Sequence, residues 1–197
     1  MSIKIGITGY IGMGKTTVAS IFSKKKISVW DADLEVHKLY KKGELGYNMI
    51  TSLYPNLKDE KKINREKLSL LIRENKVDLS KIEKIIHPLL VNSRKNFIDR
   101  NRNEKVIVFD IPLLYETNAD EWLDLVILVK CSKKVQMKRL LMRKNYDKKK
   151  IEYLLSKQME LGRERKKPNF IINTNQSIKI IENKIIDIIN RVEQLND

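Results

Sequence analysis

The segment Gly9–Thr17, GYIGMGKTT, combines glycines, a lysine and two hydroxyl residues at a spacing that suits phosphate binding. It fits the pattern G-x-x-x-x-G-K-[ST], in which backbone N–H groups surround phosphate oxygens at a helix N-terminus. There Lys15 would reach the β- and γ-phosphates, and the Thr16 hydroxyl would ligate Mg²⁺. We therefore predict a site for ATP and Mg²⁺, formed by Gly9, Ile11, Gly12, Met13, Gly14, Lys15, Thr16 and Thr17.

Two bulky residues of this loop, Tyr10 and Met13, stand where small residues are common. A residue other than glycine resists positive φ angles, so both restrict the conformation of the loop. The fixed positions of the pattern are elsewhere, and such a loop binds phosphate mainly through its backbone. We therefore expect a working phosphate loop with a bulkier wall.

Carboxylates follow two of the expected strands. Asp31 and Asp33 come at the end of strand 27–30, where open α/β sheets gather their ligands. A carboxylate there could accept the proton of an attacking hydroxyl, and the alternative is that Asp33 is a helix N-cap. Asp110 ends strand 106–109 and resembles the acid of a Walker-B strand, so we expect it to hold Mg²⁺ directly or through water.

The elements that must position these residues alternate along the chain. Short apolar segments at 3–7, 27–30, 106–109, 125–129 and 170–172 are typical of strands buried on both faces of a parallel sheet. Amphipathic patterns separate them, with Val18, Ile21 and Phe22 on one helix face and a closing helix over 177–195. Between 33 and 106 only helical patterns occur. We therefore predict an α/β fold, a five-stranded parallel sheet with helices on both faces and a helical insertion.

Composition limits the class of protein. The 197 residues carry a net charge of +15, and 42% are hydrophobic. One cysteine, Cys131, and the absence of a long apolar run predict a cytoplasmic chain without a membrane span. Residues 130–167 hold 15 basic and 4 acidic residues. This block is either a solvated helix face or a basic cover over a polyphosphate ligand.

The order and spacing of several motifs resemble the dephospho-coenzyme A kinase family over essentially the whole chain. The motifs are GYIGMGKTTVAS, VWDADLEVHKL, IIHPLL, DIPLLYE, QMKRLLMRKN and NFIIN. The resemblance implies ATP-dependent phosphorylation of the ribose 3′-hydroxyl of dephospho-CoA. It implies a P-loop kinase core at 1–33, 104–131 and 168–197, a helical CoA-binding insertion at 34–103, and a helical lid at 132–167.

The same resemblance implies roles for individual residues. Asp33 matches the general base, and Arg139 matches a lid arginine that braces the transferring phosphoryl group, with Arg143 as a second candidate. The residues implied to bind the acceptor substrate are Asp31, His87 and Glu116. Asn173 lies in the segment that helps to hold the adenine, and Gln158 matches a lid glutamine.

Local sequence features qualify this resemblance. Pro88 is expected to keep His87 out of helical geometry, which predicts a turn or a helix start there. Residues 168–175 lack the glycine usual in the family, so the base contacts in this segment can differ.

The expected partner is the small molecule dephospho-CoA, with no nucleic acid or membrane, for a monomer or weak homo-oligomer. The alternatives are a shikimate-type kinase, a nucleic-acid-associated NTPase suggested by the positive charge, and a nucleotide-binding protein without turnover. The large insertion and the HP and PLL-x-E elements disfavour the first. The confinement of the charge to one block disfavours the second, and the third requires Asp33 to be only a helix cap.

Overall fold

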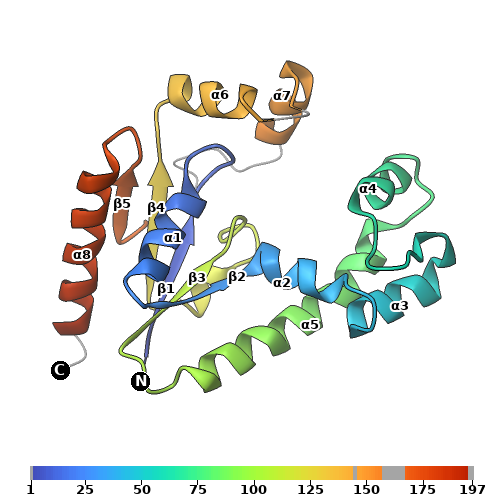
Figure 1. Ribbon diagram of the computed structural model, residues 1–197, viewed down its shortest axis with the longest axis horizontal. Coiled ribbons are helices and arrows are strands. Elements are labelled where there is room, and N and C mark those ends of the chain that lie inside the picture. Colours follow the sequence, from blue (N-terminus) through green and yellow to red (C-terminus); the bar gives the residue numbers. More distant parts are fainter. Residues whose placement is uncertain (1, 144–145, 157–166, 195–197) are drawn as a thin grey trace. The chain divides into compact units, whose positions relative to one another are not determined.

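The structure is a computed structural model that describes residues 2–143, 146–156 and 167–194 (Figure 1). The predicted residue Gln158 lies outside these ranges. The chain divides into two compact units, one of residues 1–31 with 101–197 and one of residues 32–100. In the part of the chain that the structure describes, no helix is long and apolar enough to cross a membrane.

The first unit is built on the predicted sheet of five parallel strands. These are β1 Ile3–Thr8, β2 Ser28–Asp31, β3 Val106–Asp110, β4 Leu125–Lys130 and β5 Phe170–Asn173, in the order β2-β3-β1-β4-β5. Each strand predicted from the sequence is confirmed. The register places Asp110 beside Ile7 on one side and beside Asp31 on the other. Because all strands are parallel, their carboxyl ends meet at one edge, and the phosphate loop leaves β1 at that edge.

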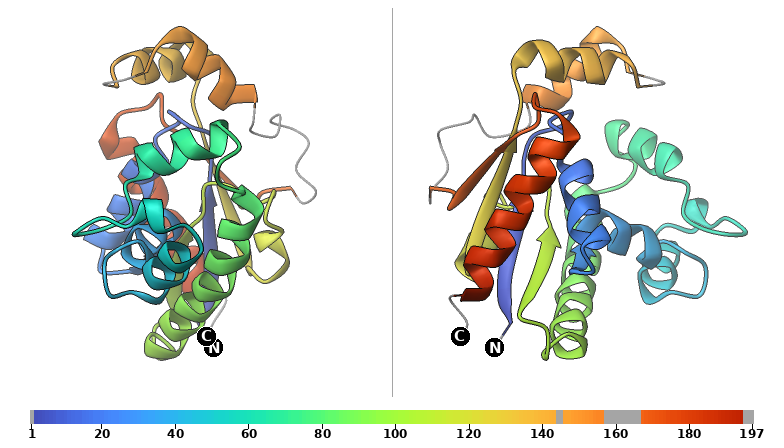
Figure 2. Two further views of the ribbon diagram at one scale, coloured as in Figure 1. Left: turned by 90° about the vertical axis from the view of Figure 1, so that its right-hand side faces the viewer. Right: turned by 60° about the vertical axis from the view of Figure 1, so that its left-hand side comes forward.

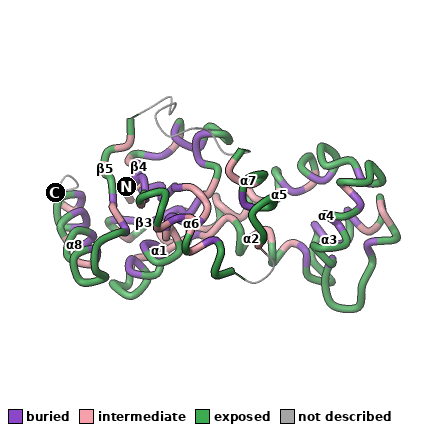
Figure 3. The backbone as a smooth tube through the Cα atoms, turned by 90° about the horizontal axis from the view of Figure 1, so that it is seen from above, coloured by how far each residue is buried: buried purple, intermediate pink, exposed green. Residues whose placement is uncertain are grey.

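Two helices, α1 Lys15–Lys24 and α8 Ile178–Gln194, pack on the same face of this sheet (Figure 2). The predicted face of α1 is buried: Val18, Ile21 and Phe22. Ile181 and Ile185 of α8 join the same core, whereas Ile178 at the start of that helix is exposed. Figure 3 shows the buried residues of the unit concentrated along the strands and on one side of α8.

The segment between β3 and β4 packs against Gly6 with two apolar side chains. A Cβ at Gly6 would lie 2.7 Å from Leu114 and 2.4 Å from Leu123. The segment contains the short 3-10 helix η2 Ala119–Glu121. Phe109 of β3 stacks edge-on against Trp122 at 5.0 Å between ring centroids. Beyond β4 the chain continues as α6 Lys133–Leu141 and α7 Lys148–Ser156.

The unit of residues 32–100 is helical. It comprises α2 Ala32–Leu39, α3 Leu45–Leu53, the 3-10 turn η1 Pro55–Leu57, α4 Arg65–Arg73 and α5 Leu79–Arg100. The buried side chains of its core come from α3, η1, α4, α5 and the connecting segments: Tyr40, Tyr47, Ile50, Leu57, Ile63, Leu68, Leu71, Val77, Ile82 and Ile86. Val36 and Leu39 of α2 pack against them and are partly buried. A hydrogen bond of 2.6 Å from Ser93 of α5 to the carboxylate of Glu35 ties α5 to α2.

The expected turn or helix start at His87 and Pro88 is wrong. Helix α5 runs without interruption from Leu79 to Arg100, with Pro88 inside it. A proline removes one helical hydrogen bond and costs roughly 3 kcal/mol in a helix interior. Here Pro88 is exposed, so water can reach the carbonyl that loses its partner, while Ile82 and Ile86 hold the same helix in the core. Tertiary packing therefore outweighs the local preference.

Candidate active site

The phosphate loop uses glycines wherever its backbone needs unusual geometry. Gly12 and Gly14 have φ of 81° and 89°, and Gly14 directly precedes α1. A Cβ at Gly9 would lie 2.5 Å from the carbonyl oxygen of Val129, so only glycine fits there. Tyr10 and Met13 are not among the residues with positive φ. The two bulky residues therefore leave the backbone of the loop unstrained.

The side chains of Tyr10 and Met13 have different surroundings. Met13 is 3% exposed, and its N–H donates to the carbonyl of Tyr10 at 3.0 Å. Tyr10 is half-buried and lines a small pocket together with Gly9 and Glu116. Met13 thus anchors the loop in the core, while Tyr10 forms part of the wall that the sequence predicts.

Side chains of α6 and of the residue that follows β5 donate hydrogen bonds to carbonyl groups of the loop. Gln136 Nε2 donates to the Ile11 carbonyl at 2.8 Å, and Thr174 Oγ1 donates to the Met13 carbonyl at 2.7 Å. Among the described residues no side chain caps α1, so its first N–H groups can face an anion, where the helix dipole favours negative charge. This is the arrangement that phosphate oxygens require.

A buried ion pair joins the loop to the end of β3. Lys15 Nζ pairs with Asp110 Oδ1, and the two side chains are 14% and 2% exposed. An ammonium has three donors, so Lys15 can keep this contact and still donate to a phosphate. The pairing brings together two residues that the sequence predicts for phosphate and for metal.

The donors around this pair fit a magnesium ion that arrives with a nucleotide. In the described part of the chain, no group of three or more His, Cys, Asp or Glu side chains could hold a metal by itself. Mg²⁺ keeps several waters and binds proteins through one or two oxygen ligands plus substrate phosphates. The exposed Thr16 at the start of α1 and the Asp110 carboxylate are such a set.

Arg139 of α6 lies beside the N-terminus of α1. A Cβ at Gly14 would be 3.2 Å from Arg139 Nη1 and 3.2 Å from Thr174 Oγ1. Arg139 donates to Thr174 Oγ1 and to the Thr174 carbonyl, both at 2.9 Å. Burial raises the pKa of the neighbouring Cys131 thiol, although the Arg139 charge and hydrogen bonding to Thr174 oppose this. The structure therefore places a guanidinium at the phosphate loop.

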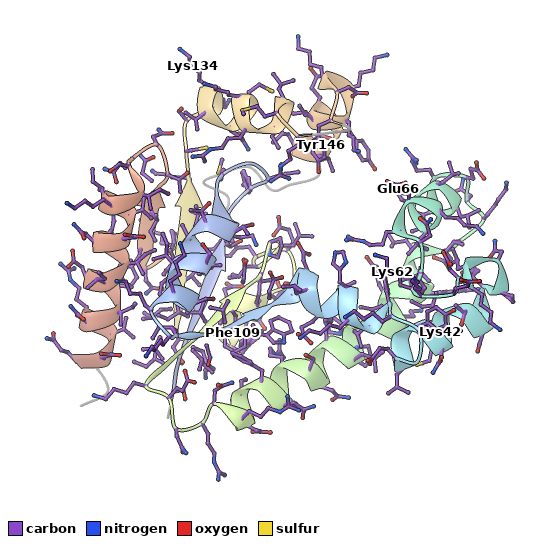
Figure 4. All side chains as sticks on the ribbon, in the orientation of Figure 1. Lys42, Lys62, Glu66, Phe109, Lys134 and Tyr146 are labelled. Atoms are coloured by element: carbon purple, nitrogen blue, oxygen red, sulfur yellow. The ribbon has the colours of Figure 1, made fainter. Side chains whose placement is uncertain are left out.

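Arg143 is placed differently. It is exposed, and its guanidinium carbon lies 5.6 Å from the ring centroid of Tyr146, the residue labelled between α6 and α7 in Figure 4. The contact that the structure gives this side chain is a cation–π contact. The structure therefore does not bring Arg143 to the loop as it brings Arg139.

The segment after β5 uses its polar side chains to fix its own backbone. Asn173 Oδ1 accepts from the Asn175 N–H at 3.0 Å, and Asn175 Oδ1 accepts from the Ser132 N–H at 3.1 Å. Thr174 is 4% exposed and holds both Arg139 and the loop. Sequence reasoning missed Thr174 and Gln136. For Gln136 a signal existed, because Gln136, Arg139 and Leu140 share one helix face at i, i+3 and i+4.

Two of the residues predicted to bind the acceptor, Asp31 and Glu116, lie in the same unit as the phosphate loop. Asp31 is the last residue of β2 and lies beside Asp110 in the register. Glu116 is exposed at the small pocket that Tyr10 also lines.

The other predicted substrate residues belong to the unit of residues 32–100. Asp33 is exposed in the first turn of α2, which begins at Ala32, so Asp33 is inside the helix and not its N-cap. His87 is exposed on α5.

The same unit contains a pocket of about 310 Å³. It is lined by His37, Tyr40, Asp59, Lys62, Ile63, Asn64, Arg65 and Glu66, of which Lys62 and Glu66 are labelled in Figure 4. Arg65 Nη1 contacts His37 Nε2, and because a guanidinium can only donate, the imidazole nitrogen accepts. The pocket therefore holds an arginine oriented by a histidine.

Comparisons with known proteins identify the family of the chain. The model of the family described as "Dephospho-CoA kinase" matches residues 3–179. A protein named dephospho-CoA kinase from Bartonella henselae is 38% identical over 187 residues, covering 94% of this chain and 95% of its own length. A solved dephospho-CoA kinase from Campylobacter jejuni is 26% identical with a TM-score of 0.69, and the match covers 100% of both chains.

A crystal structure of a Thermus thermophilus protein has a TM-score of 0.81 at 22% identity, covering 96% of this chain and 97% of its own, which supports the fold alone. The family model and the curated relatives together show that the chain belongs to the dephospho-CoA kinase family.

Proposed function

We propose that this chain transfers the γ-phosphoryl group of ATP to the ribose 3′-hydroxyl of dephospho-CoA, giving coenzyme A and ADP. The family assignment supports ATP-dependent phosphorylation of dephospho-CoA. The observation that carries the proposal in the structure is the convergence of Lys15, Asp110 and Arg139 around the N-terminus of α1.

On the donor side, the N–H groups that begin α1 bind phosphate oxygens, and Lys15 donates to the β- and γ-phosphates. Arg139 stabilises the charge that develops on the transferring group, because such donors act most strongly where water is excluded. Thr16 and Asp110 would hold Mg²⁺, which neutralises phosphate charge when bound. Residues 168–175, with Asn173, hold the adenine.

On the acceptor side, Asp33 takes the proton of the attacking 3′-hydroxyl as general base. Asp31, His87 and Glu116 bind the acceptor, and segment 34–103 is its CoA-binding insertion. The pocket of the 32–100 unit supports this, because a cationic Arg65 held by His37 can bind a phosphate-bearing ligand. The basic segment 132–167 acts as a lid with Arg143, and it limits hydrolysis by excluding water.

The proposal extends to the setting of the reaction. We place the enzyme in the cytoplasm as a monomer or weak homo-oligomer, with a small-molecule substrate and neither nucleic acid nor membrane as partner. The single cysteine of the sequence supports a reducing compartment. Most of the excess positive charge lies in the block of residues 130–167, which supports a polyphosphate as the ligand and not a nucleic-acid strand.

The proposal is tested by measuring ADP release from ATP and Mg²⁺ with dephospho-CoA, shikimate, AMP or RNA in separate reactions. We expect turnover with dephospho-CoA alone. Turnover with another acceptor and none with dephospho-CoA would contradict the assignment. A reaction without acceptor measures ATP hydrolysis and is subtracted from each.

A further inference from the structure

Thr174 holds the guanidinium of Arg139 with two different atoms. Its hydroxyl oxygen accepts from Nη1 and its carbonyl oxygen accepts from Nη2, both at 2.9 Å. Two bonds to one residue fix the plane of the guanidinium as well as its position. The Thr174 backbone is itself fixed, since its N–H donates to the Lys130 carbonyl at 2.9 Å as β5 ends beside β4.

The same hydroxyl also binds the phosphate loop. Thr174 Oγ1 donates to the Met13 carbonyl at 2.7 Å, so its one proton is used on the loop and a lone pair is used on Arg139. The Thr174 side chain is 4% exposed, so water cannot readily replace these hydrogen bonds. Losing this hydroxyl would therefore remove one hydrogen bond to the loop and one to Arg139.

Helix α6 is attached to the loop beyond this contact. Gln136 is 5% exposed and donates to the Ile11 carbonyl at 2.8 Å. Leu140 is fully buried, and its Cγ lies 2.9 Å from where a Cβ of Gly12 would be. These two residues and Arg139 lie on one face of α6, one helical turn apart. The helix face that carries Arg139 thus packs directly on the loop.

We propose that Thr174 is a positioning residue, whose hydroxyl and carbonyl oxygens form a clasp that holds the Arg139 guanidinium beside the phosphate loop. Arg139 then acts from a fixed position in the core, without movement of a lid. The inference rests on the proposed role of Arg139 in phosphoryl transfer. It narrows the lid proposed above, because it assigns α6, the first helix of segment 132–167, to the frame of the site. An arginine held in place has no rotamer freedom to lose when the reaction begins.

The direct test uses Thr174→Val, Thr174→Ser, Arg139→Ala and the double variant Thr174→Val/Arg139→Ala. Valine keeps the shape of threonine without its hydroxyl. We expect Thr174→Val to lower kcat by about 10- to 100-fold with little change in the KM for ATP, because one charge-stabilising donor is misplaced. Serine keeps the hydroxyl and should restore most of the activity. In the Arg139→Ala background, the valine change should have little further effect.

The matched control is Thr51→Val, because the Thr51 hydroxyl also bonds a main-chain carbonyl, that of Tyr47 at 2.8 Å, within the other unit. Its activity should equal that of the wild type. Thermal unfolding of each variant shows whether it folds. If Thr174→Val does not fold, Thr174→Ala replaces it in the same cycle.

A second readout does not depend on activity. In the wild-type protein the Nη–H signals of Arg139 in NMR spectra should exchange slowly with water. In Thr174→Val the Nη1–H signal should exchange faster, because the hydroxyl that accepts from Nη1 is lost while the Thr174 carbonyl still accepts from Nη2. Fast exchange in the wild type would overturn the clasp, even if no Thr174 variant folded.

The outcomes separate the two claims. Normal turnover by Arg139→Ala would contradict the role of Arg139 in the proposed function, while slow exchange would still support the clasp. A slow Arg139→Ala beside a fully active Thr174→Val, or additive losses in the double variant, would overturn the positioning role of Thr174.

Discussion

The phosphate loop and the pocket of the 32–100 unit are both suited to phosphate, but they are built in different ways. The loop is held by buried partners: Asp110 is 2% exposed, Thr174 4% and Gln136 5%. The pocket presents exposed charges, with Arg65 held by an exposed His37 and with Asp59 and Glu66 nearby. A rigid anion site suits charge that develops in a transition state, whereas an open pocket suits ground-state binding.

This contrast predicts how substitutions divide between kcat and KM. Changes around the loop and at the general base should reduce kcat, because they remove stabilisation of the transition state. Changes in the pocket should raise the KM for the acceptor and leave kcat nearly intact.

Asp33→Asn should have the largest effect. Removing a general base lowers kcat by about 10²- to 10⁴-fold, while ATP binding stays close to that of the wild type. Steady-state kinetics and a titration with an ATP analogue measure the two quantities, and Asp99→Asn, an exposed acid on α5, is the matched control. Normal turnover by Asp33→Asn would show that another residue is the general base. The unit of residues 32–100 would then contain no residue whose loss is predicted to lower kcat.

Lys15→Ala should lower kcat by about 10²-fold or more, because Lys15 stabilises the transferring phosphoryl group. It should also lower stability by roughly 3 kcal/mol, since Asp110 is left as a buried, unpaired carboxylate. The double variant Lys15→Ala/Asp110→Asn should regain stability and remain inactive. Lys24→Ala, at the exposed end of the same helix, should change neither quantity. A stable and active Lys15→Ala would contradict the account of the loop.

Arg65→Ala should raise the KM for dephospho-CoA by about tenfold and change kcat less than twofold, since a charge-assisted contact is worth about 1.5 kcal/mol or more. Arg73→Ala, in the last turn of the same helix, is the control. An unchanged KM would show that the acceptor does not bind in this pocket. A fall in kcat alone would contradict the proposed difference between the loop, where changes lower kcat, and the pocket, where changes raise KM.

Glu35→Gln should have the smallest effect. Burial opposes the charge of Glu35, but hydrogen bonds from Lys38 and Ser93 lower its pKa below the ordinary value. A lowered folded-state pKa contributes stability above the unfolded value and loses it as the pH falls through the folded value. Unfolding by denaturant should show a deficit of roughly 0.5–1 kcal/mol near pH 7 that shrinks in acid.

The control is Glu74→Gln, which alters an exposed ion pair with Lys76. Its stability should match that of the wild type at both pH values. A deficit for Glu35→Gln that grew in acid would have the opposite sign to the one expected.

The fold was predictable because its signals are local. Each strand is a short apolar segment, and the pattern of the phosphate loop contains its own glycines, so residues 9–17 could be assigned without distant contacts. Thr174 could not be assigned, because its partner Met13 lies 161 residues away. Gln136 shares a helix face with the predicted Arg139, but its bond to Ile11, 125 residues away, could not be read from the sequence. The turn or helix start at Pro88 was predicted wrongly for the same reason. Helix α5 continues through Pro88 because Ile82 and Ile86 pack in the core, and these contacts are not visible in the local sequence.

A single-turnover reaction with γ-labelled ATP and dephospho-CoA tests the central claim most directly. The account predicts that the label moves to the acceptor and is removed again by a 3′-nucleotidase, with coenzyme A as the only labelled product. Label released as inorganic phosphate beside unchanged dephospho-CoA, or label resistant to the 3′-nucleotidase, would contradict it.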